Sequence, residues 1–281
     1  MHPYQGIEVA FATKHKKADL VVDLFRSALN ISVITADVDT DSFGTFSGEI
    51  ERKSSPLDTA IAKAKAGVMA SGSNFGLASE GSIGNDSLVP FAISDIETMV
   101  FVDLERELII HESYKSFDIT AHSASIKEAL EIAKEVEKFD IPKHKVIAKV
   151  KSQSGNVIAI KGLSDLSEFM SAFEKLLPQA IDNVVTFESD FRAHCSPSRQ
   201  VNIKEVASRL LNRISSLCPG CNAPGFGALT FERGLICNSC GVLNAKALKN
   251  EILNCVTCDY STPGQVVAEI IEPAHCMNCN P

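Results

Sequence analysis

The pattern of hydrophobic and polar positions predicts alternating strands and helices at the start of the chain. Apolar residues run almost unbroken over residues 7–12 and return over residues 31–38, as in strands of a buried sheet. Between them, residues 18–29 carry apolar side chains at helical spacing. A strand–helix–strand unit favours an α/β fold.

A second helix is predicted to begin next to Ser55, which can cap it. Pro56 suits the first helical position, and Asp58 completes a Ser-x-x-acid capping box. After this helix we expect a short strand and then a turn of small residues that carries one acid, Glu80, exposed and with no neighbouring side chain to shield it.

The remaining pattern predicts two hairpins, three helices and a strand. The hairpins turn near Glu105 and Gly155, within residues 96–113 and 144–160. The helices cover residues 126–136, 166–177 and 203–217, and the strand covers residues 183–189. Because the last helix ends where cysteines begin, we expect an α/β domain over residues 1–214 and a small zinc-ribbon domain over residues 215–281.

Composition narrows the class of protein. Hydrophobic residues make up 45% of the 281 residues and charged residues 22%, which is typical of a globular protein with a core. There is no apolar run of the roughly 20 residues that a bilayer span needs, and no signal-peptide pattern. We therefore expect a cytoplasmic protein without a membrane partner. The net charge of −8 argues against general polyanion binding.

Eight of the nine cysteines form Cys-x-x-Cys pairs near the end of the chain, a pattern typical of metal sites. Fifteen residues separate the first two pairs and seventeen the last two, as in zinc ribbons. We predict two structural zinc sites with four thiolates each. The ligands would be Cys218, Cys221, Cys237, Cys240, Cys255, Cys258, Cys276 and Cys279.

Consecutive pairing of these motifs is the favoured arrangement, and an interleaved cross-brace is left open. Four sulfur ligands leave no open position, so the zinc would not be catalytic. From residue 215 onward there are three Lys and Arg against five Asp and Glu. The tail is therefore a poor clamp for nucleic acid, and a protein partner fits it better. Cys195, the ninth cysteine, has no such partner and is expected to be a bystander thiol.

Acidic and basic residues gather in the predicted turns of the first domain. Asp41, Glu49, Asp58 and Glu80 could bind Mg²⁺ or Mn²⁺ and steer water. These four are the candidate catalytic residues.

The candidate substrate-binding residues lie in three other turns. Thr13, His15 and Lys17 stand between the first strand and the first helix, where phosphate groups are favoured. Ser82 follows Glu80, and a later loop carries Arg192, His194 and Arg199. We expect these residues to hold a small nucleotide ligand.

Four short motifs together resemble the house-cleaning nucleoside-triphosphate pyrophosphatases, which remove inosine and xanthosine triphosphates. They are "TKHKKA" from Thr13, "TAIAKA" from Thr59, "LASEGS" from Leu77, and "HCSPSR", which ends at Arg199. His15 and Ala18 depart from the family's Asn and Lys. Over its full length, the chain also looks like an uncharacterised bacterial family with a cysteine-rich tail.

The resemblance implies a mixed sheet in a two-lobed α/β domain with substrate in the cleft. It implies metal-dependent hydrolysis of non-standard nucleoside triphosphates to a monophosphate and pyrophosphate, with Arg199 on the far part of the ligand. The alternative is a nucleotide-sensing or adaptor protein without catalysis, whose zinc tail binds a protein or nucleic-acid partner. The sequence leaves the oligomeric state open, a homodimer included.

Overall fold

The chain forms two compact units in the computed structural model, which describes residues 1–14 and 16–281 apart from the side chains of residues 228 and 229. Residues 4–211 make the first, which we call the α/β unit. Residues 212–281, with residues 1–3, make the second, which we call the cysteine unit. Among the helices of the described chain, none combines the length and the apolar character that a membrane span requires.

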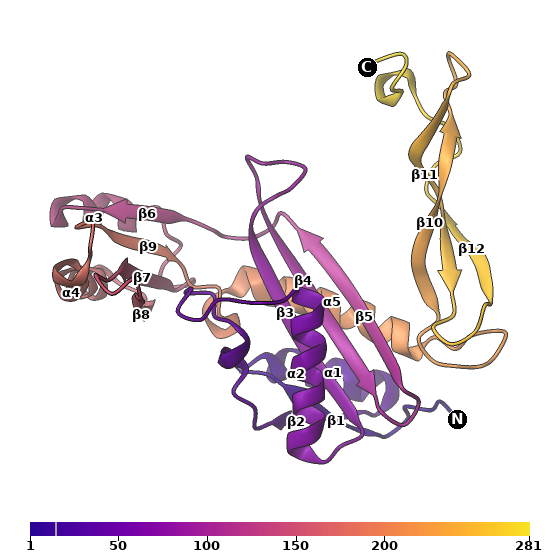
Figure 1. Cartoon of the computed structure of the whole chain (residues 1–281), viewed down its shortest axis with the longest axis horizontal. Helices are drawn as coiled ribbons and strands as arrows, with labels where there is room; N and C mark the ends of the chain where they lie inside the picture. Colours follow the sequence, from indigo (N-terminus) through magenta and orange to yellow (C-terminus); the bar gives the residue numbers. More distant parts are fainter. Residues whose placement is uncertain (15) are drawn as a thin grey trace. The chain divides into compact units, whose positions relative to one another are not determined.

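A five-stranded mixed sheet forms the first lobe of the α/β unit (Figure 1). The strand order is β2-β1-β3-β4-β5; β1 pairs in parallel with β2 and β3, whereas β3, β4 and β5 form an antiparallel meander. The bounds are β1 (Glu8–Ala12), β2 (Ser32–Ala36), β3 (Phe75–Asn85), β4 (Ile93–Asp103) and β5 (Leu108–Ser116).

Helix α2 (Pro56–Ser71) covers one face of this sheet. It begins as predicted, because the Ser55 hydroxyl accepts the backbone N–H of Asp58 at 3.1 Å. Ala60 and Ala64 of the helix pack against Ala78 of β3. Such small side chains let the helix lie close to the strands, so that face is filled by backbone and methyl groups.

The opposite face of the sheet carries helices α1 (Lys17–Leu29) and α5 (Pro197–Ser215). Side chains alternate along a strand, so odd-numbered residues of β3 and β4 point away from α2. Accordingly Ser79 meets Lys17 of α1, and Asp95 accepts a hydrogen bond from Asn202 of α5 at 2.8 Å. Figure 1 shows α2 in front of the sheet and α5 behind it.

A four-stranded antiparallel sheet, in the order β6-β9-β7-β8, forms the second lobe. Its core includes the parallel rings of Phe169 and Phe187, with centroids 4.9 Å apart. The bounds are β6 (Ser123–Ile126), α3 (Ala129–Val136), β7 (Val146–Lys151), β8 (Val157–Leu163), α4 (Leu166–Leu176) and β9 (Val185–Ser189). The 3-10 turns of the α/β unit are η1 (Thr40–Phe43), which follows β2, η2 (Leu177–Gln179) and η3 (Ala193–Cys195).

Both predicted hairpins are confirmed, as β4–β5 and β7–β8. Two helix starts differ from prediction. Ile126 belongs to strand β6, so that helix begins only at Ala129. The last helix begins at Pro197, earlier than predicted, because proline is well tolerated in the first turn of a helix.

The expected turn of small residues around Glu80 is wrong. Strand β3 runs unbroken from Phe75 to Asn85 and pairs with β4 residue by residue. Its glycines and serines serve packing instead. A Cβ at Gly76 would lie 2.5 Å from the backbone oxygen of Ala64, so the approach of α2 requires glycine there.

The cysteine unit is built on a long three-stranded antiparallel ribbon with β11 in the centre (Figure 1). Strands of 10 and 12 residues, β10 and β11, place their two ends roughly 35 Å apart. The bounds are β10 (Gly227–Ile236), β11 (Leu243–Asn254) and β12 (Ser261–Val266), followed by a 3-10 turn η4 (Pro273–His275).

Candidate anion-binding pocket and metal centres

A pocket of about 140 Å³ lies in the α/β unit, beyond the end of β1, where β3 extends past its pairing with β1. The parallel pairing stops at Phe11 with Leu77, so the next residues of β3 are open toward the loop after β1. Ligands of α/β proteins commonly bind beyond the carboxyl ends of such strands. The lining comprises Ala12, Thr13, Lys14, Lys17, Thr40, Asp41, Gly44, Thr45, Phe46, Ser47, Lys63, Ser79, Glu80, Ile147, Lys161, Arg192 and Arg199.

Cations outnumber acids in this lining. Six of its side chains are basic and two are acidic, although the whole chain carries a net charge of −8. The six come from four separate parts of the sequence: Lys14 and Lys17, Lys63, Lys161, and Arg192 and Arg199. The pocket is therefore locally rich in basic side chains on an acidic protein, a composition that suits an anion.

Glu80 is the acid at the centre of the lining, and it is neither exposed nor unshielded as predicted. It is 5% exposed and accepts hydrogen bonds from two cations. Lys63 of α2 and Arg52 each donate to one carboxylate oxygen at 2.5 Å. The prediction was wrong because no local pattern reveals that a helix and a loop bring two cations to this strand.

Lys17 lies on the other side of β3, buried and without a carboxylate partner among the described residues. Its Nζ donates to the hydroxyl of Ser79 at 3.2 Å. Burial, and then the nearby charge of Arg199, lower the pKa of Lys17 to about 8. An entering anion would supply the negative charge that this amine lacks.

Arg199 is fixed on three sides and retains one unused donor. Nε donates to Glu97 at 2.5 Å, Nη1 donates to the backbone oxygen of Phe191, and the guanidinium lies 4.4 Å from the ring centre of Phe46. Arg199 is 1% exposed, and its Nη2 has no hydrogen-bond partner among the described residues. A buried guanidinium N–H is costly to leave unpaired, so this atom points to a ligand.

Gly81 provides the space that Arg199 occupies. A Cβ at this position would overlap Nη2 of Arg199 and would lie 2.7 Å from Oε1 of Glu97. The glycine that looked like a turn residue is therefore a requirement of the buried ion pair.

Asp41 and Glu49, two of the other candidate acids, are also paired with cations. Asp41 and Asp39 both accept hydrogen bonds from Lys14, and Glu49 accepts from Ser47 at 2.6 Å and pairs with Lys161. Lys161 belongs to β8 of the second lobe, so this last pair joins the two lobes across the pocket. In the absence of ligand, these carboxylates neutralise the cations that an anion would use.

Several predicted site residues do line the pocket or its surroundings. Thr13 lines it directly, and so does Arg192, which Asp190 holds through Nε at 3.0 Å and Nη2 at 2.6 Å. Ser82 lines a neighbouring pocket of about 210 Å³, which shares Phe46 and Glu80 with the first.

Three predicted residues, Glu49, Asp58 and His194, are not among the lining. Asp58 is exposed and caps α2 through Ser55. His194 is exposed as a residue, and the partial desolvation of its ring, followed by the charge of Arg192, lowers its pKa. His15 lies outside the described residues. Burial raises the pKa of the Cys195 thiol to about 11, which argues against a nucleophile there.

Sequence reasoning missed Lys63, Lys161, Arg52 and Glu97. Lys63 had a signal, because it stands between Ala60 and Ala64 on the buried face of a predicted helix. Glu97 had one also, as an acid in an apolar strand. For Lys161 and Arg52 there was none, because only tertiary contacts bring them to this site.

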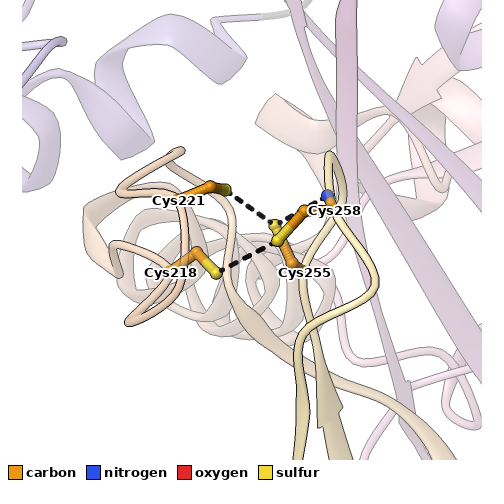
Figure 2. A group of neighbouring side chains, drawn as sticks. All are labelled: Cys218, Cys221, Cys255 and Cys258. Atoms are coloured by element: carbon orange, nitrogen blue, oxygen red, sulfur yellow. Dashed lines mark hydrogen bonds between the residues drawn. The ribbon is translucent and has the colours of Figure 1, made fainter.

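The eight paired cysteines gather in two groups of four. Figure 2 shows the first group, Cys218, Cys221, Cys255 and Cys258. Cys218 and Cys221 meet Cys258 and Cys255, with sulfur–sulfur distances of 3.8 and 3.6 Å. The corresponding distances in the second group, Cys237 to Cys279 and Cys240 to Cys276, are 3.9 and 3.7 Å. A tetrahedral zinc with Zn–S bonds near 2.3 Å places sulfurs about 3.8 Å apart, so both groups are compatible with structural zinc.

The favoured consecutive pairing is wrong, and the arrangement is interleaved. The first and third motifs share one group, and the second and fourth share the other. The antiparallel ribbon explains this, because each strand carries the chain from one end to the other before the next motif appears. Backbone N–H groups, such as those of Gly220 and Thr257, donate to the sulfurs as expected around thiolates.

Comparison with known proteins supports a family assignment without an activity. No curated protein matches the chain, and no relation to the nucleoside-triphosphate pyrophosphatases is shown. One protein family, described as a domain of unknown function (DUF6671), matches residues 63–281. This match covers Glu80, Arg199 and all eight paired cysteines, and it spans more than half of the sequence. The chain therefore belongs to the DUF6671 family.

Proposed function

We propose that the α/β unit binds a nucleoside triphosphate through its phosphates and hydrolyses it with a divalent cation, releasing a monophosphate and pyrophosphate. The observation that carries this proposal is the buried pair of cations without full partners. Lys17 has no carboxylate partner among the described residues, and Arg199 has an unused Nη2 donor. Phosphate oxygens suit both groups.

The size of the pocket favours the phosphates rather than the nucleoside as its occupant. About 140 Å³ accommodates a short phosphate chain, and the neighbouring pocket of about 210 Å³ is available for the rest of the ligand. Phe46 lines both, and its ring could contact a base at their junction.

The paired acids support a role for a divalent cation. Mg²⁺ is commonly held by one or two carboxylates together with substrate phosphates, and it would orient water for attack on phosphorus. If phosphates take Lys14 and Lys63, Asp41 loses its hydrogen bond from Lys14, and Glu80 loses that from Lys63 while it keeps that from Arg52. Each acid could then turn an oxygen toward a cation bound beside the phosphates.

A second candidate is a module that binds the nucleotide without turning it over. The pairing of Glu80 with both Lys63 and Arg52 favours this candidate, because each carboxylate oxygen already accepts a hydrogen bond from a cation and is less open to a metal ion. We also propose that both cysteine groups hold structural zinc, which would stabilise the cysteine unit.

Pyrophosphate release by the zinc-loaded full chain tests the proposal. The assay uses common and deaminated nucleoside triphosphates with Mg²⁺ or Mn²⁺, beside Glu80→Gln, Lys17→Met and the control Asp58→Asn. We expect turnover to fall at least 100-fold in Glu80→Gln and to stay within about twofold in Asp58→Asn, which alters only an exposed cap. Thermal unfolding and zinc content verify that each variant is folded.

Calorimetric binding of pyrophosphate separates the two candidates. Binding by the wild type that weakens in Lys17→Met, with no turnover of any nucleotide, would favour the sensing module. If the wild type neither binds pyrophosphate nor hydrolyses a triphosphate, the pocket is not a phosphate site and the proposal fails.

A further inference from the structure

A chain of hydrogen bonds outside the pocket lies at the start of helix α5. The carboxylate of Asp140 contacts Nδ1 of His144 at 2.8 Å, and Nε2 of His144 contacts the hydroxyl of Ser198 at 3.0 Å. His144 is 5% exposed, so the ring is held inside the protein. Its position and partners are not explained by the anion site itself.

The order of groups resembles that of a hydrolytic Asp-His-Ser triad, but the remaining contacts give a different role. The backbone N–H of Ser198 also donates to Nε2 at 3.2 Å, so the ring must accept there and donate from Nδ1 to Asp140. The Ser198 hydroxyl in turn accepts the backbone N–H of Thr120 at 3.1 Å. These contacts occupy the base and the hydroxyl with backbone groups, as in a helix cap rather than a nucleophile.

This cap fixes the backbone directly before Arg199. Ser198 and Arg199 lie in the first turn of α5, so a shift of one moves the other. The same loop holds the preceding segment as well, because Lys145 donates its N–H to the backbone oxygen of Cys195 at 2.9 Å. The side chain of Arg199 must meet Glu97, Phe191 and Phe46 at once, which leaves little tolerance in its backbone position.

We infer that Asp140, His144 and Ser198 are positioning residues that set Arg199 for phosphate binding. This inference rests on the proposed function for its effect on ligand affinity. The structural part of the inference, that His144 fixes the position of Arg199, can be tested without a ligand. His144 is not among the residues that line the pocket, and in this role it acts through the start of helix α5.

The ligand test is a double-mutant cycle with pyrophosphate as the probe, measured by calorimetry on the full zinc-loaded chain. His144→Ala should weaken binding about tenfold, since small displacements of a positioning group have large effects. His144→Gln should restore most of the affinity, because its amide oxygen can accept the N–H of Ser198. In an Arg199→Met background, His144→Ala should cause no further loss. Additive losses would show that His144 acts independently of Arg199.

A matched control removes another histidine from the same lobe. His122 contacts Glu135 and the ring of Phe139, and within the described part of the chain its side chain makes no hydrogen bond or ion pair to α5. His122→Ala should leave affinity for pyrophosphate unchanged even if it lowers the unfolding temperature. An equal loss of affinity in both histidine variants would reduce the effect to general destabilisation and overturn the inference.

The ligand-free test follows the Nε–H resonance of Arg199 by NMR, assigned from its loss in Arg199→Met. Hydrogen bonding to Glu97 and burial should make this proton slow to exchange. We expect faster exchange in His144→Ala and near wild-type exchange in His144→Gln and His122→Ala. Unchanged exchange in His144→Ala would refute the role of His144 in positioning Arg199. If the wild type does not bind pyrophosphate, the proposed function fails and this resonance still decides the inference.

Discussion

At the scale of single residues, the buried charges behind the pocket are the most distinctive feature of the α/β unit. Asp95 and Glu97 alternate along β4 and point to the same face, and neither is exposed to solvent. Arg199 pairs with Glu97, whereas among the described residues the Asp95 carboxylate accepts a hydrogen bond only from the amide of Asn202. Burial, and then the charge of Glu97, raise the pKa of Asp95 to about 7.

Replacement of Asp95 by Asn should stabilise the protein in a pH-dependent way. A raised pKa means that the folded chain keeps a proton which the unfolded chain releases near pH 4, so stability falls as pH rises from about 4 to about 7. Asp95→Asn removes this fall. We expect no gain at pH 4 and a gain of roughly 2 kcal/mol at pH 8, or about 4 to 8 °C in Tm. Thermal unfolding at the two pH values measures it; an equal gain at both would contradict a titrating Asp95.

At the scale of elements, strand β3 contributes residues to the site from both of its faces. Its even-numbered Glu80 faces the cations from α2 and the loop before it, and its odd-numbered Ser79 and Gly81 face Lys17 and Arg199. A single strand therefore presents different chemistry on each face while its edge is open beside the end of β1.

Gly81→Ala should damage the site, and Gly84→Ala on the same strand is its matched control. The new methyl at 81 would displace the guanidinium of Arg199 from Glu97, whereas a Cβ at 84 meets nothing within 4 Å. We expect Gly81→Ala to weaken pyrophosphate binding at least tenfold and to lower stability by about 1 to 3 kcal/mol. Gly84→Ala should change neither by a measurable amount. Calorimetry and urea unfolding provide the comparison, and similar behaviour of the two variants would refute the packing role of Gly81.

At the scale of the whole molecule, the interleaved metal groups follow from the topology of the cysteine unit. Motifs one and three lie at one end of the ribbon and motifs two and four at the other, because each strand reverses the chain direction. With strand ends roughly 35 Å apart, Cys221 cannot share a metal with Cys237.

Zinc content of two double variants tests this pairing. Cys218→Ser with Cys255→Ser removes two cysteines from one group, and should leave one zinc per chain where we expect two in the wild type. Cys218→Ser with Cys237→Ser removes a ligand from each group, and should leave none. Elemental analysis after dialysis gives the counts. The reverse result would require consecutive pairing.

Local patterns in the sequence were sufficient to predict features that depend on neighbouring residues. The cap at Ser55, the hairpins near Glu105 and Gly155, and the eight cysteines that gather in fours all follow from spacing over short stretches. These features form because turn chemistry, side-chain period and thiol knuckles are local properties.

Tertiary structure alone decided which distant residues meet. Strand order placed Lys17, Lys63 and Arg199 around one pocket, although more than 180 positions separate the first from the last. The direction of β11 decided the partners of Cys218, and continued pairing with β4 turned an expected loop at Glu80 into a buried strand. Such contacts depend on the sheet as a whole, since the partners and the burial of each of these side chains come from elements remote from it in sequence.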